Sequence, residues 1–317
     1  MKLALLFGRR LLLSALLALI IPAIIFVLIG LSPGSIGERL LGDAPPAAVH
    51  ALEVQLGLDQ PIIVQYAHWF ADVFQGNFGT SYVTAQPVTT VLGSRSVVTT
   101  TIIVGALLLS TIIGIPFGVA SARSRRAPLA VINVLSVIGM ALPNFVIALA
   151  LMQIFAVMFR LVPATGYVAF DTSPGNWLLS IILPVVALSV HLVTSVVKQT
   201  RDQMMSVSQG DFVKSLRARG IGRASIIGKH ELRNAMIPVV TVIGVNMVAA
   251  VGGSIYIEQV FALPGVGRSL IQAVGLGDIP VLLGCAFYFT VVTIVVNILV
   301  DLAYVVLDPR MRANGVA

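Results

Sequence analysis

Two short stretches of the chain come close to patterns that carry chemistry. In "GRASIIGKH", five residues separate Gly222 from Gly228 where a phosphate-binding loop has four, and His230 stands where Ser or Thr would bind magnesium. "HELRN" begins like a zinc-protease helix, but Asn234 occupies the position of the second histidine. No G-x-S-x-G nucleophile elbow occurs. We therefore expect no catalytic residue and no metal site, and we predict that the chain is not an enzyme.

An ion-coupled secondary transporter usually needs ionisable groups inside the membrane, where they are costly and are kept for function. The apolar segments of this chain offer His191 and Asp301. A hydrogen-bonded packing role is the simpler interpretation of His191. Asp301 lies near the end of its segment, where it can reach the interface or pair with Arg310. The sequence thus indicates that any transport is energised from outside this chain.

A basic stretch interrupts the apolar pattern. Residues 210–240, "GDFVKSLRARGIGRASIIGKHELRNAMIPVV", hold six of the 20 Lys and Arg residues. A helix over 211–219 would have an apolar side and a basic side. The apolar side would consist of Phe212, Val213 and Leu216, and the basic side of Lys214 and Arg217, with Arg219 at the border. Gly220 suits the left-handed residue that ends a helix. Two interpretations stay open: a helix lying on anionic lipid, or a cytoplasmic knob that docks into a partner and passes its motion to the neighbouring spans.

Composition sets the class of protein. The chain has 317 residues, of which 57% are hydrophobic and 10% charged, whereas about 25% charged residues are usual in soluble domains. The net charge of +7 is divided among short loops, so it does not form the basic face of a nucleic-acid-binding domain. The single cysteine, Cys285, allows neither a disulfide framework nor a cysteine metal site. We predict an all-α integral membrane protein.

Six segments are long and apolar enough to cross a bilayer, which takes about 20 residues in a helix. They are 11–31, 97–122, 129–159, 178–197, 235–257 and 281–306. The apolar run of the first is too long for a signal peptide, so we expect it to stay in the mature protein. Pro143 is expected to bend the third.

The distribution of basic residues predicts the orientation. Of the 20 Lys and Arg residues, 16 lie in the N-terminus, the 123–126 loop, the 198–233 stretch and the C-terminal tail. The other four are Arg39, Arg95, Arg160 and Arg268. The positive-inside rule then places both termini and the basic stretch in the cytoplasm.

The largest segment on the other side, residues 32–96, lacks a spanning run and is predicted to hold two short amphipathic helices. Prolines 45 and 46 suit the start of the first and Gly57 its end; Pro61 suits the start of the second and Gly76 its end. The apolar faces would consist of Val49, Leu52 and Leu56 in the first, and of Ile62, Tyr66, Trp69, Phe70 and Val73 in the second. We interpret the segment as a small cap, with a plain linker as the alternative.

The basic stretch resembles the cytoplasmic loop of the B-type permease subunit of dipeptide, oligopeptide and nickel ABC importers. That family typically reads Y-V-R-T-A-R-A-K-G-L there, followed by R-H-A-L-R-N-A-L-L-P-V-V. The positions that agree or are close are Phe212, Val213, Lys214, Arg217, Ala218, Gly220, His230, Leu232, Arg233, Asn234, Ala235 and Pro238, whereas Ser215 and Leu216 depart modestly. "LGLDQPIIVQY", "GNFGTSYVTAQPV", "GGSIYIEQVFALPGVGRSLIQAVGLGDIPVLLG" and "NILVDLAYVVLDPRMR" also resemble the family, in the right order. The resemblance therefore extends over nearly the whole chain.

The resemblance implies a type I ABC importer permease fold in a bacterial plasma (inner) membrane. The expected parts are the N-terminus and first helix (1–31), the extracytoplasmic segment (32–96), a five-helix core (97–306) with a coupling loop (198–234), and a cytoplasmic tail (307–317). Besides membrane lipid, the implied partners are a homologous second permease, two ATP-binding cassette subunits and an extracytoplasmic substrate-binding lipoprotein. ATP and magnesium would be used by the ATPase subunits, and this chain would bind no cofactor and no nucleic acid.

The resemblance also implies site residues. The coupling helix, seated in a groove of one ATPase, would consist of Asp211, Phe212, Val213, Lys214, Leu216, Arg217, Ala218, Arg219 and Gly220. Phe212, Val213 and Leu216 would be its apolar anchors, with Lys214, Arg217 and Arg219 pairing charges at the rim. Asn246, Gly252, Gly253 and Ser254 would line the substrate pathway, with plain helix packing as the alternative. Glu258, Pro264 and Gly265 would lie at the outer mouth, where Glu258 could bind a peptide amine, contact the binding protein, or be a solvated loop charge. The expected cargo is di- or oligopeptides, carried by alternating access, with a nickel complex, glutathione or an oligosaccharide as alternatives.

Overall fold

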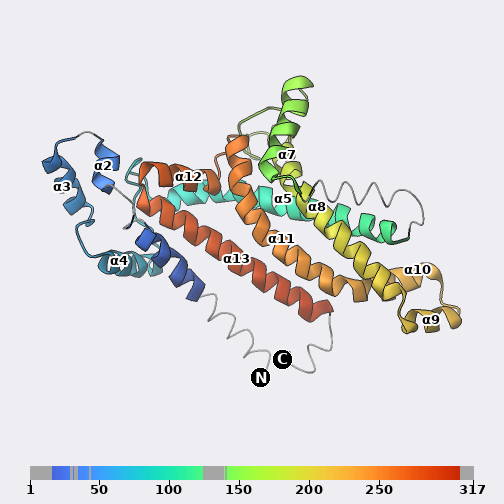
Figure 1. Ribbon diagram of the computed structural model, residues 1–317. Helices are drawn as coiled ribbons and strands as arrows, with labels where there is room; N and C mark the ends of the chain where they lie inside the picture. Colours follow the sequence, from blue (N-terminus) through green and yellow to red (C-terminus); the bar gives the residue numbers. More distant parts are fainter. Residues whose placement is uncertain are drawn as a thin grey trace. The chain divides into compact units, whose positions relative to one another are not determined.

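The computed structural model describes residues 16–28, 31, 35–42, 44–123, 139 and 141–307. Within these ranges the chain is mainly helical, and its one β-pairing is an isolated bridge between Thr80 and Pro87. Predictions for residues 1–15, for Arg125 and Arg126, for the start of the third span and for the tail with Arg310 lie outside the described residues. The helices in chain order are Leu16–Leu28, α2 (Ile36–Leu41), α3 (Pro46–Gln55), α4 (Ile62–Phe74), α5 (Val88–Arg123), α7 (Asn144–Leu151), η1 (Met152–Met158), α8 (Pro174–Ser208), α9 (Asp211–Ala218), α10 (Arg223–Ser225), η2 (Ile226–Glu231), α11 (Leu232–Val260), α12 (Val266–Leu276) and α13 (Ile279–Leu307) (Figure 1).

Four helices of the described part are long and apolar enough to cross a membrane: Val88–Arg123, Pro174–Ser208, Arg223–Val260 and Ile279–Ala303. They contain the predicted second, fourth and fifth spans and most of the sixth. The predicted first and third spans correspond to the shorter apolar helices Leu16–Leu28 and Asn144–Met158. Residues outside the described ranges border Leu16–Leu28 on both sides, whereas Asn144–Met158 directly follows Pro143.

The expectation that Pro143 bends a continuous helix is wrong. The backbone at Pro143 is extended, with φ −60° and ψ 141°, and α7 begins at the next residue. Proline has no N–H to donate within a helix and disfavours helical backbone in the residue before it. It therefore stands outside the helix here and precedes α7 as its N-cap.

The chain folds as two compact units, one made of residues 1–99 and 264–294 and the other of residues 100–263 and 295–317. In the first unit, both predicted short helices are confirmed. Pro45 and Pro61 are the N-caps of α3 and α4, and Gly57 and Gly76 follow these helices with φ values of +68° and +78°. Their conformations explain the glycines, because a side chain is strained at such angles.

Two further helices of the first unit were not predicted. The six-residue α2 begins with a capping box, in which Ser35 Oγ accepts a hydrogen bond from the Glu38 N–H and the Glu38 carboxylate accepts one from the Ser35 N–H. The other is α12, which directly follows Pro264 and Gly265, two residues expected at the outer mouth.

Asp278 joins the end of α12 to the loop before α5 within the first unit. It is buried, and its carboxylate accepts hydrogen bonds from the Ser81 hydroxyl and, at 3.1 Å, from the backbone N–H of Tyr82. A cluster formed by Phe26, Ile279 and Leu283 packs nearby against Tyr82. Burial, and secondarily the charge of Asp278, raises the pKa of the Tyr82 phenol to about 12.

We expect Tyr82 to stay protonated in the folded chain well after the unfolded chain would have ionised. Because its folded pKa lies above the ordinary value of 10.0, its contribution to stability is complete below pH 10 and is lost as the pH rises from 10 to about 12. An absorbance titration at the tyrosinate band, taken as the difference between the wild-type chain and Tyr82→Phe, measures this. A Tyr82 midpoint near 10 would contradict the buried position.

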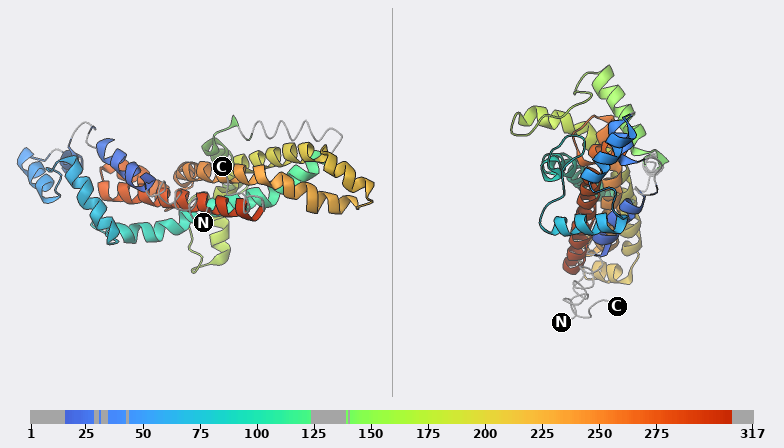
Figure 2. Two further views of the ribbon diagram at one scale, coloured as in Figure 1. Left: turned by 90° about the horizontal axis from the view of Figure 1, so that it is seen from below. Right: turned by 90° about the vertical axis from the view of Figure 1, so that its left-hand side faces the viewer.

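The second unit is held together by close helix contacts. Helices α8 and α11 lie side by side, and α7 contacts both (Figure 2). Three glycines of α5 face branched side chains of α8: Gly105 meets Val185, Gly114 meets Val196 and Gly118 meets Thr200. Small residues let membrane helices approach closely, so these positions set the spacing between α5 and α8.

Replacing Gly118 with alanine is expected to destabilise the fold by about 1–3 kcal/mol, because the added methyl group overpacks the contact. A Cβ at this position would lie 2.9 Å from the Val197 carbonyl oxygen and closer still to Thr200. Gly93→Ala on the same helix is the matched control, since no atom lies within 4 Å of its Cβ position. Thermal unfolding in detergent measures both variants, and equal stability of the two would contradict the close contact.

Candidate functional site

The predicted basic helix is present as α9, Asp211–Ala218, with Arg219 as its C-cap. Gly220 follows in the left-handed region, with φ +75°, as predicted. The N–H of Ile221 donates to the Leu216 carbonyl at 3.2 Å and the N–H of Gly220 to the Arg217 carbonyl at 3.0 Å. This pair of bonds is the Schellman arrangement that closes a helix C-terminus. The end of α9 is therefore fixed by backbone geometry that only glycine adopts easily.

The side chains of α9 divide differently from the expectation. Val213 is fully buried within this chain, so it cannot be an anchor that contacts a partner. The adjacent Phe212 is 41% exposed and Leu216 is half-buried. A helical pattern shows which residues share a face but not what covers that face. In the structure α9 packs against η2 of its own chain, and the inward side chain is Val213.

The charged residues of α9 have partners of unequal quality. Lys214 Nζ lies 2.8 Å from Asp211 Oδ1, but both side chains are largely exposed, so the pair adds little stability. Arg217 Nη2 lies 3.9 Å from Glu231 Oε1 and keeps 63% of its side chain exposed. Arg219 is exposed at the end of the helix.

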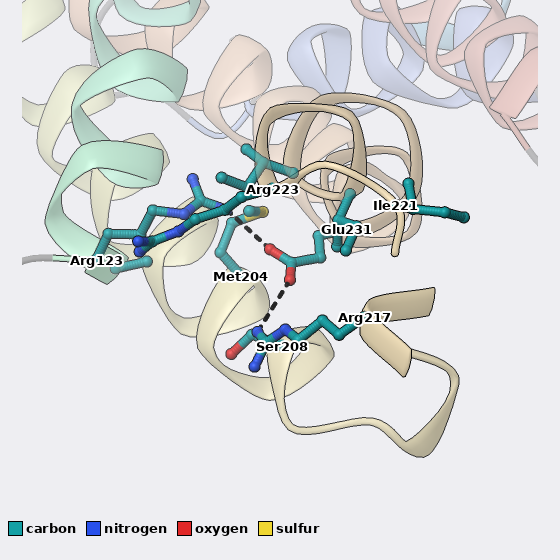
Figure 3. A pocket seen from close by; sticks show the side chains of 10 residues that line it. Arg123, Met204, Ser208, Arg217, Ile221, Arg223 and Glu231 are labelled. Carbon is teal, nitrogen blue, oxygen red and sulfur yellow. Dashed lines mark hydrogen bonds and ion pairs between the residues drawn. The ribbon is translucent and has the colours of Figure 1, made fainter. Parts of the chain in front are cut away.

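Glu231 connects α9 with a distant part of the second unit. Its carboxylate, only 4% exposed, lies 2.8 Å from Nη2 of Arg123 at the end of α5, and it also faces Arg217 (Figure 3). A buried carboxylate is costly unless it is paired and hydrogen-bonded. The two arginines meet that requirement from two different helices. Glu231 thus ties the end of α5 to the start of α11, and its contact with Arg217 of α9 is longer and more exposed.

These arginines border a cavity of about 560 Å³. Its lining includes Arg123, Arg217, Arg223, Ser208 and Glu231. Three guanidinium groups and one carboxylate give the cavity an excess of positive charge. Groups with acidic character are therefore favoured at its opening.

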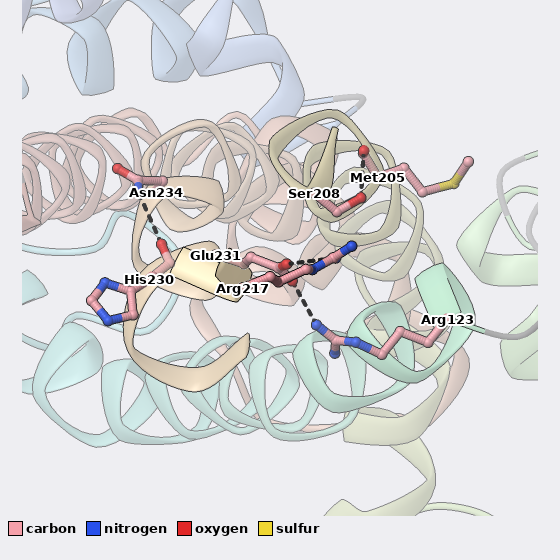
Figure 4. A network of polar contacts seen from close by, with 7 residues as sticks. All are labelled: Arg123, Met205, Ser208, Arg217, His230, Glu231 and Asn234. Carbon is pink, nitrogen blue, oxygen red and sulfur yellow. Dashed lines mark hydrogen bonds and ion pairs between the residues drawn. The ribbon is translucent and has the colours of Figure 1, made fainter. Parts of the chain in front are cut away.

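The stretch "HELRN", which begins like a zinc-protease helix, forms a hydrogen bond within its own helix. Asn234 Nδ2 donates a 2.8 Å hydrogen bond to the backbone carbonyl of His230, one helical turn earlier (Figure 4). Among the described residues, no three His, Cys, Asp or Glu side chains gather in a group that could hold a metal ion.

The four residues expected to line the pathway lie on α11, and three of them pack within the chain. Asn246 is buried, with its amide 3.5 Å from the Leu192 carbonyl, and Ser254 is buried and donates to the Val251 carbonyl. A Cβ on Gly253 would lie 2.8 Å from Asn144 and 2.9 Å from Leu188. Helix packing therefore accounts for Asn246, Gly253 and Ser254 in this conformation.

Gly252 differs from its three neighbours on α11. It is exposed, and no atom lies within 4 Å of its Cβ position. Of the four residues expected to line the pathway, only Gly252 is on the surface of this chain, where cargo could contact it.

Of the three alternatives for Glu258, the solvated loop charge is wrong. Glu258 lies in the last part of α11 and is fully buried. Gly265 is also buried and is the N-cap of α12, whereas Pro264 is exposed. Glu258 therefore does not contact cargo or a binding protein in this conformation, and of these three residues only Pro264 is accessible.

Comparison with protein families identifies the chain. Residues 114–313 match the family described as "Binding-protein-dependent transport system inner membrane component". Residues 3–104 match the N-terminal part described for membrane components of the same systems. The chain belongs to this family. It is a permease subunit and a multi-pass inner-membrane protein, as the sequence analysis expected, and the permease family does not itself consist of enzymes.

Individual relatives agree with this assignment. A protein of Brucella abortus (strain 2308), provisionally named as the permease of a peptide transport system, is 35% identical over 296 residues, covering 93% of this chain and 94% of that protein. The glutathione transport system permease protein GsiC of Salmonella choleraesuis (strain SC-B67) has the same identity and coverage. A structure of the MetNI methionine ABC transporter in an inward-facing conformation matches with a TM-score of 0.53 and 15% identity, covering 69% of this chain and 97% of that one. That likeness shows the type I importer permease fold.

The sequence analysis did not predict the ion pair between Glu231 and Arg123 beside α9. A signal for Glu231 was present, because it is the only acidic residue between Asp211 and Glu258 in a region with six basic ones. A lone carboxylate among arginines predicts an ion pair. The partner Arg123 lies 108 residues away, so no spacing rule could have named it.

Proposed function

We propose that this permease subunit forms one half of a translocation pathway for di- or oligopeptides and works by alternating access. A homologous permease forms the other half. Two ATP-binding cassette subunits dock on the cytoplasmic side, one of them on α9, and an extracytoplasmic lipoprotein delivers the cargo. ATP and magnesium are used by the ATPase subunits, and this chain binds no cofactor. Closure of the ATPase dimer favours one of two conformations of the pathway and hydrolysis restores the other.

The observation that carries the coupling role is the division of α9 into an anchored and a free side. Val213 is buried in the chain, while Phe212 and Arg219 are exposed. The carboxylate of Glu231 links Arg217 on α9 to Arg123 on α5. A force applied to the free side of α9 therefore reaches η2 and α11 through the packing of α9 on η2, and α5 through the 2.8 Å pair of Glu231 with Arg123. The exposed helix could also lie on anionic lipid, and the experiment below separates the two roles.

The proposed orientation has both termini in the cytoplasm. It is supported by the 16 basic residues that share one side in the predicted topology. It is also supported by the ion pair between Arg123 and Glu231, which puts the end of α5 and the basic stretch at the same end of the second unit.

Peptides are the proposed cargo because relatives of similar identity are named for peptide and glutathione transport. Peptides and glutathione share amide backbones. The same machinery with glutathione, a nickel complex or an oligosaccharide is the alternative. An ion-coupled transporter has less support, since the chain belongs to a family of binding-protein-dependent systems and its spans offer few ionisable side chains, His191 in α8 and Asp301 in α13.

Gly220→Pro and Leu216→Asp test the coupling role. Proline cannot adopt φ +75° or donate the N–H bonded to the Arg217 carbonyl, and aspartate places a charge on the docking side. We expect both variants to insert normally but to lose ATPase subunits in a pull-down from mild detergent, together with ATP-dependent uptake of a labelled dipeptide. Capture and uptake at wild-type levels would refute docking on α9. If capture is lost in the variants while the wild-type complex carries only a non-peptide solute, the coupling role stands and the peptide assignment fails.

A further inference from the structure

Helix α4 has an apolar face that nothing in the described chain covers. Ile63 is 81% exposed and Phe74 is 78% exposed. With 3.6 residues per turn, these two residues lie on one side of the helix with Ala67 and Phe70 between them. The opposite side of α4 carries Gln65, His68 and Asp72. The uncovered face therefore holds no charge, and the ionisable groups of α4 all point away from it.

The inner face of α4 packs against the apolar helix Leu16–Leu28, which belongs to the predicted first span. The rings of Tyr66 and Trp69 lie 5.6 Å and 6.1 Å from the ring of Phe26, in the apolar helix Leu16–Leu28. The Tyr66 hydroxyl donates a 2.8 Å hydrogen bond to the backbone carbonyl of Leu19 in that same helix. Leu19 lies seven residues, or about 10 Å of helix, before Phe26. The middle of α4 is therefore beside the apolar stretch and not beyond its end.

The three faces of α4 have the order that an interfacial helix requires. The inner face, with Tyr66 and Trp69, lies between the apolar and the polar face, about a quarter turn from each. The inner face packs against the side of the helix Leu16–Leu28. If α4 lies in the plane of the membrane, its apolar face then points toward the membrane centre and its polar face toward water. Tyr and Trp are also the side chains enriched at the level of the headgroups.

We propose that α4 is an interfacial helix whose Ile63–Phe74 face lies in the phospholipid leaflet on the side of residues 32–96. The lipid acyl chains are its partner. The helix Leu16–Leu28, against which α4 packs, is itself apolar and exposed on part of its surface, where Leu17, Ile20 and Ile24 are 41–52% exposed. A 13-residue helix is too short to cross the bilayer, but its length, its aromatic residues and its neutral face suit a position in the plane of the interface.

This position gives α4 a task in the permease. The helix holds the extracytoplasmic segment at a fixed depth, because its inner face binds the apolar helix Leu16–Leu28 and its flank binds lipid. The inference depends on the membrane assignment of the chain and not on the proposed cargo or on docking at α9. Its test is therefore independent of theirs.

The test uses single cysteines labelled with the environment-sensitive fluorophore nitrobenzoxadiazole. Ile63→Cys and Phe74→Cys report on the apolar flank, and Asp72→Cys on the polar flank is the matched control. Wild-type chain is the blank, because its one thiol, Cys285, is fully buried. The full chain, purified with the partners that accompany it, is placed in nanodiscs of phosphatidylethanolamine and phosphatidylglycerol, with and without dibrominated phosphatidylcholine.

We expect labels at positions 63 and 74 to emit at shorter wavelength and to lose about half their fluorescence in brominated nanodiscs, because an interfacial helix lies about 5–10 Å deep. The label at position 72 should be quenched by aqueous iodide and not by bromine. Aqueous behaviour at both 63 and 74 would overturn the proposal. An apolar environment at these positions without bromine quenching would also overturn it, since it would mean that a protein covers the face.

Discussion

Replacing Phe212 with alanine is expected to weaken ATPase capture about 30-fold, equivalent to about 2 kcal/mol for an aromatic anchor at an interface. Stability should stay unchanged, because Phe212 is exposed in the free chain. Capture is measured by titrating the purified ATPase subunit against the permease in nanodiscs, and uptake of a labelled dipeptide should fall in parallel.

The neighbouring residue is the control. Val213 is fully buried, so Val213→Ala should lower the free energy of unfolding by about 1–2 kcal/mol while the folded fraction still captures the ATPase. The two residues are adjacent in sequence and both apolar, so a general loss of hydrophobicity cannot explain opposite results. Full capture by Phe212→Ala, or loss of capture by Val213→Ala at low temperature where it is folded, would contradict the assigned faces.

Glu231→Gln is expected to lower the free energy of unfolding by about 2 kcal/mol, because it removes the charge that pairs with Arg123 in a buried position. The structure further predicts that Arg123 and Arg217 contribute unequally to the stability of the Glu231 carboxylate. Arg123 lies 2.8 Å from the carboxylate with 24% of its side chain exposed, whereas Arg217 lies 3.9 Å away and is 63% exposed.

Double-mutant cycles separate these two contacts. Reversible unfolding of Glu231→Gln, Arg123→Gln and the double variant should give a coupling energy of about 1–2 kcal/mol. The cycle with Arg217→Gln should give about 0.5 kcal/mol or less, as expected for an exposed pair. Equal coupling energies in the two cycles would contradict this prediction, because Glu231 would then bind Arg217 of α9 as strongly as Arg123 of α5.

The predictions made from sequence succeeded where a local signal marks a local structure. Pro45, Gly57, Pro61 and Gly76 mark the limits of α3 and α4, and Gly220 marks the end of α9. Each of these residues restricts or frees its own backbone, so no information from elsewhere in the chain is needed.

The sequence did less well where a structure depends on its surroundings. The apolar pattern located the fourth span at 178–197, but α8 continues to Ser208 through Lys198, Arg201 and Asp202. Hydropathy reports the part of a helix that lies in lipid, whereas the backbone hydrogen bonds continue into water. The ends of the helix are therefore not the ends of the apolar run.

Burial inside the chain was equally hard to foresee. Val213 and Phe212 share an apolar pattern, and only the packing of α9 against η2 turns one inward. Glu258 follows the last predicted apolar residue of its span and was expected at the outer mouth, but α11 extends past it and Glu258 is buried. Which side chain is covered depends on contacts distant in sequence.

The glycines of α5 constrain how sequences of this permease can diverge. Three of them face a branched residue of α8: Gly105 faces Val185, Gly114 faces Val196 and Gly118 faces Thr200. A larger residue on α5 is tolerated only when its counterpart on α8 shrinks, so neither position can drift alone. Descendants of this sequence should therefore exchange volume between the two members of each pair, with the bulk moving from one helix to the other while their sum stays nearly constant.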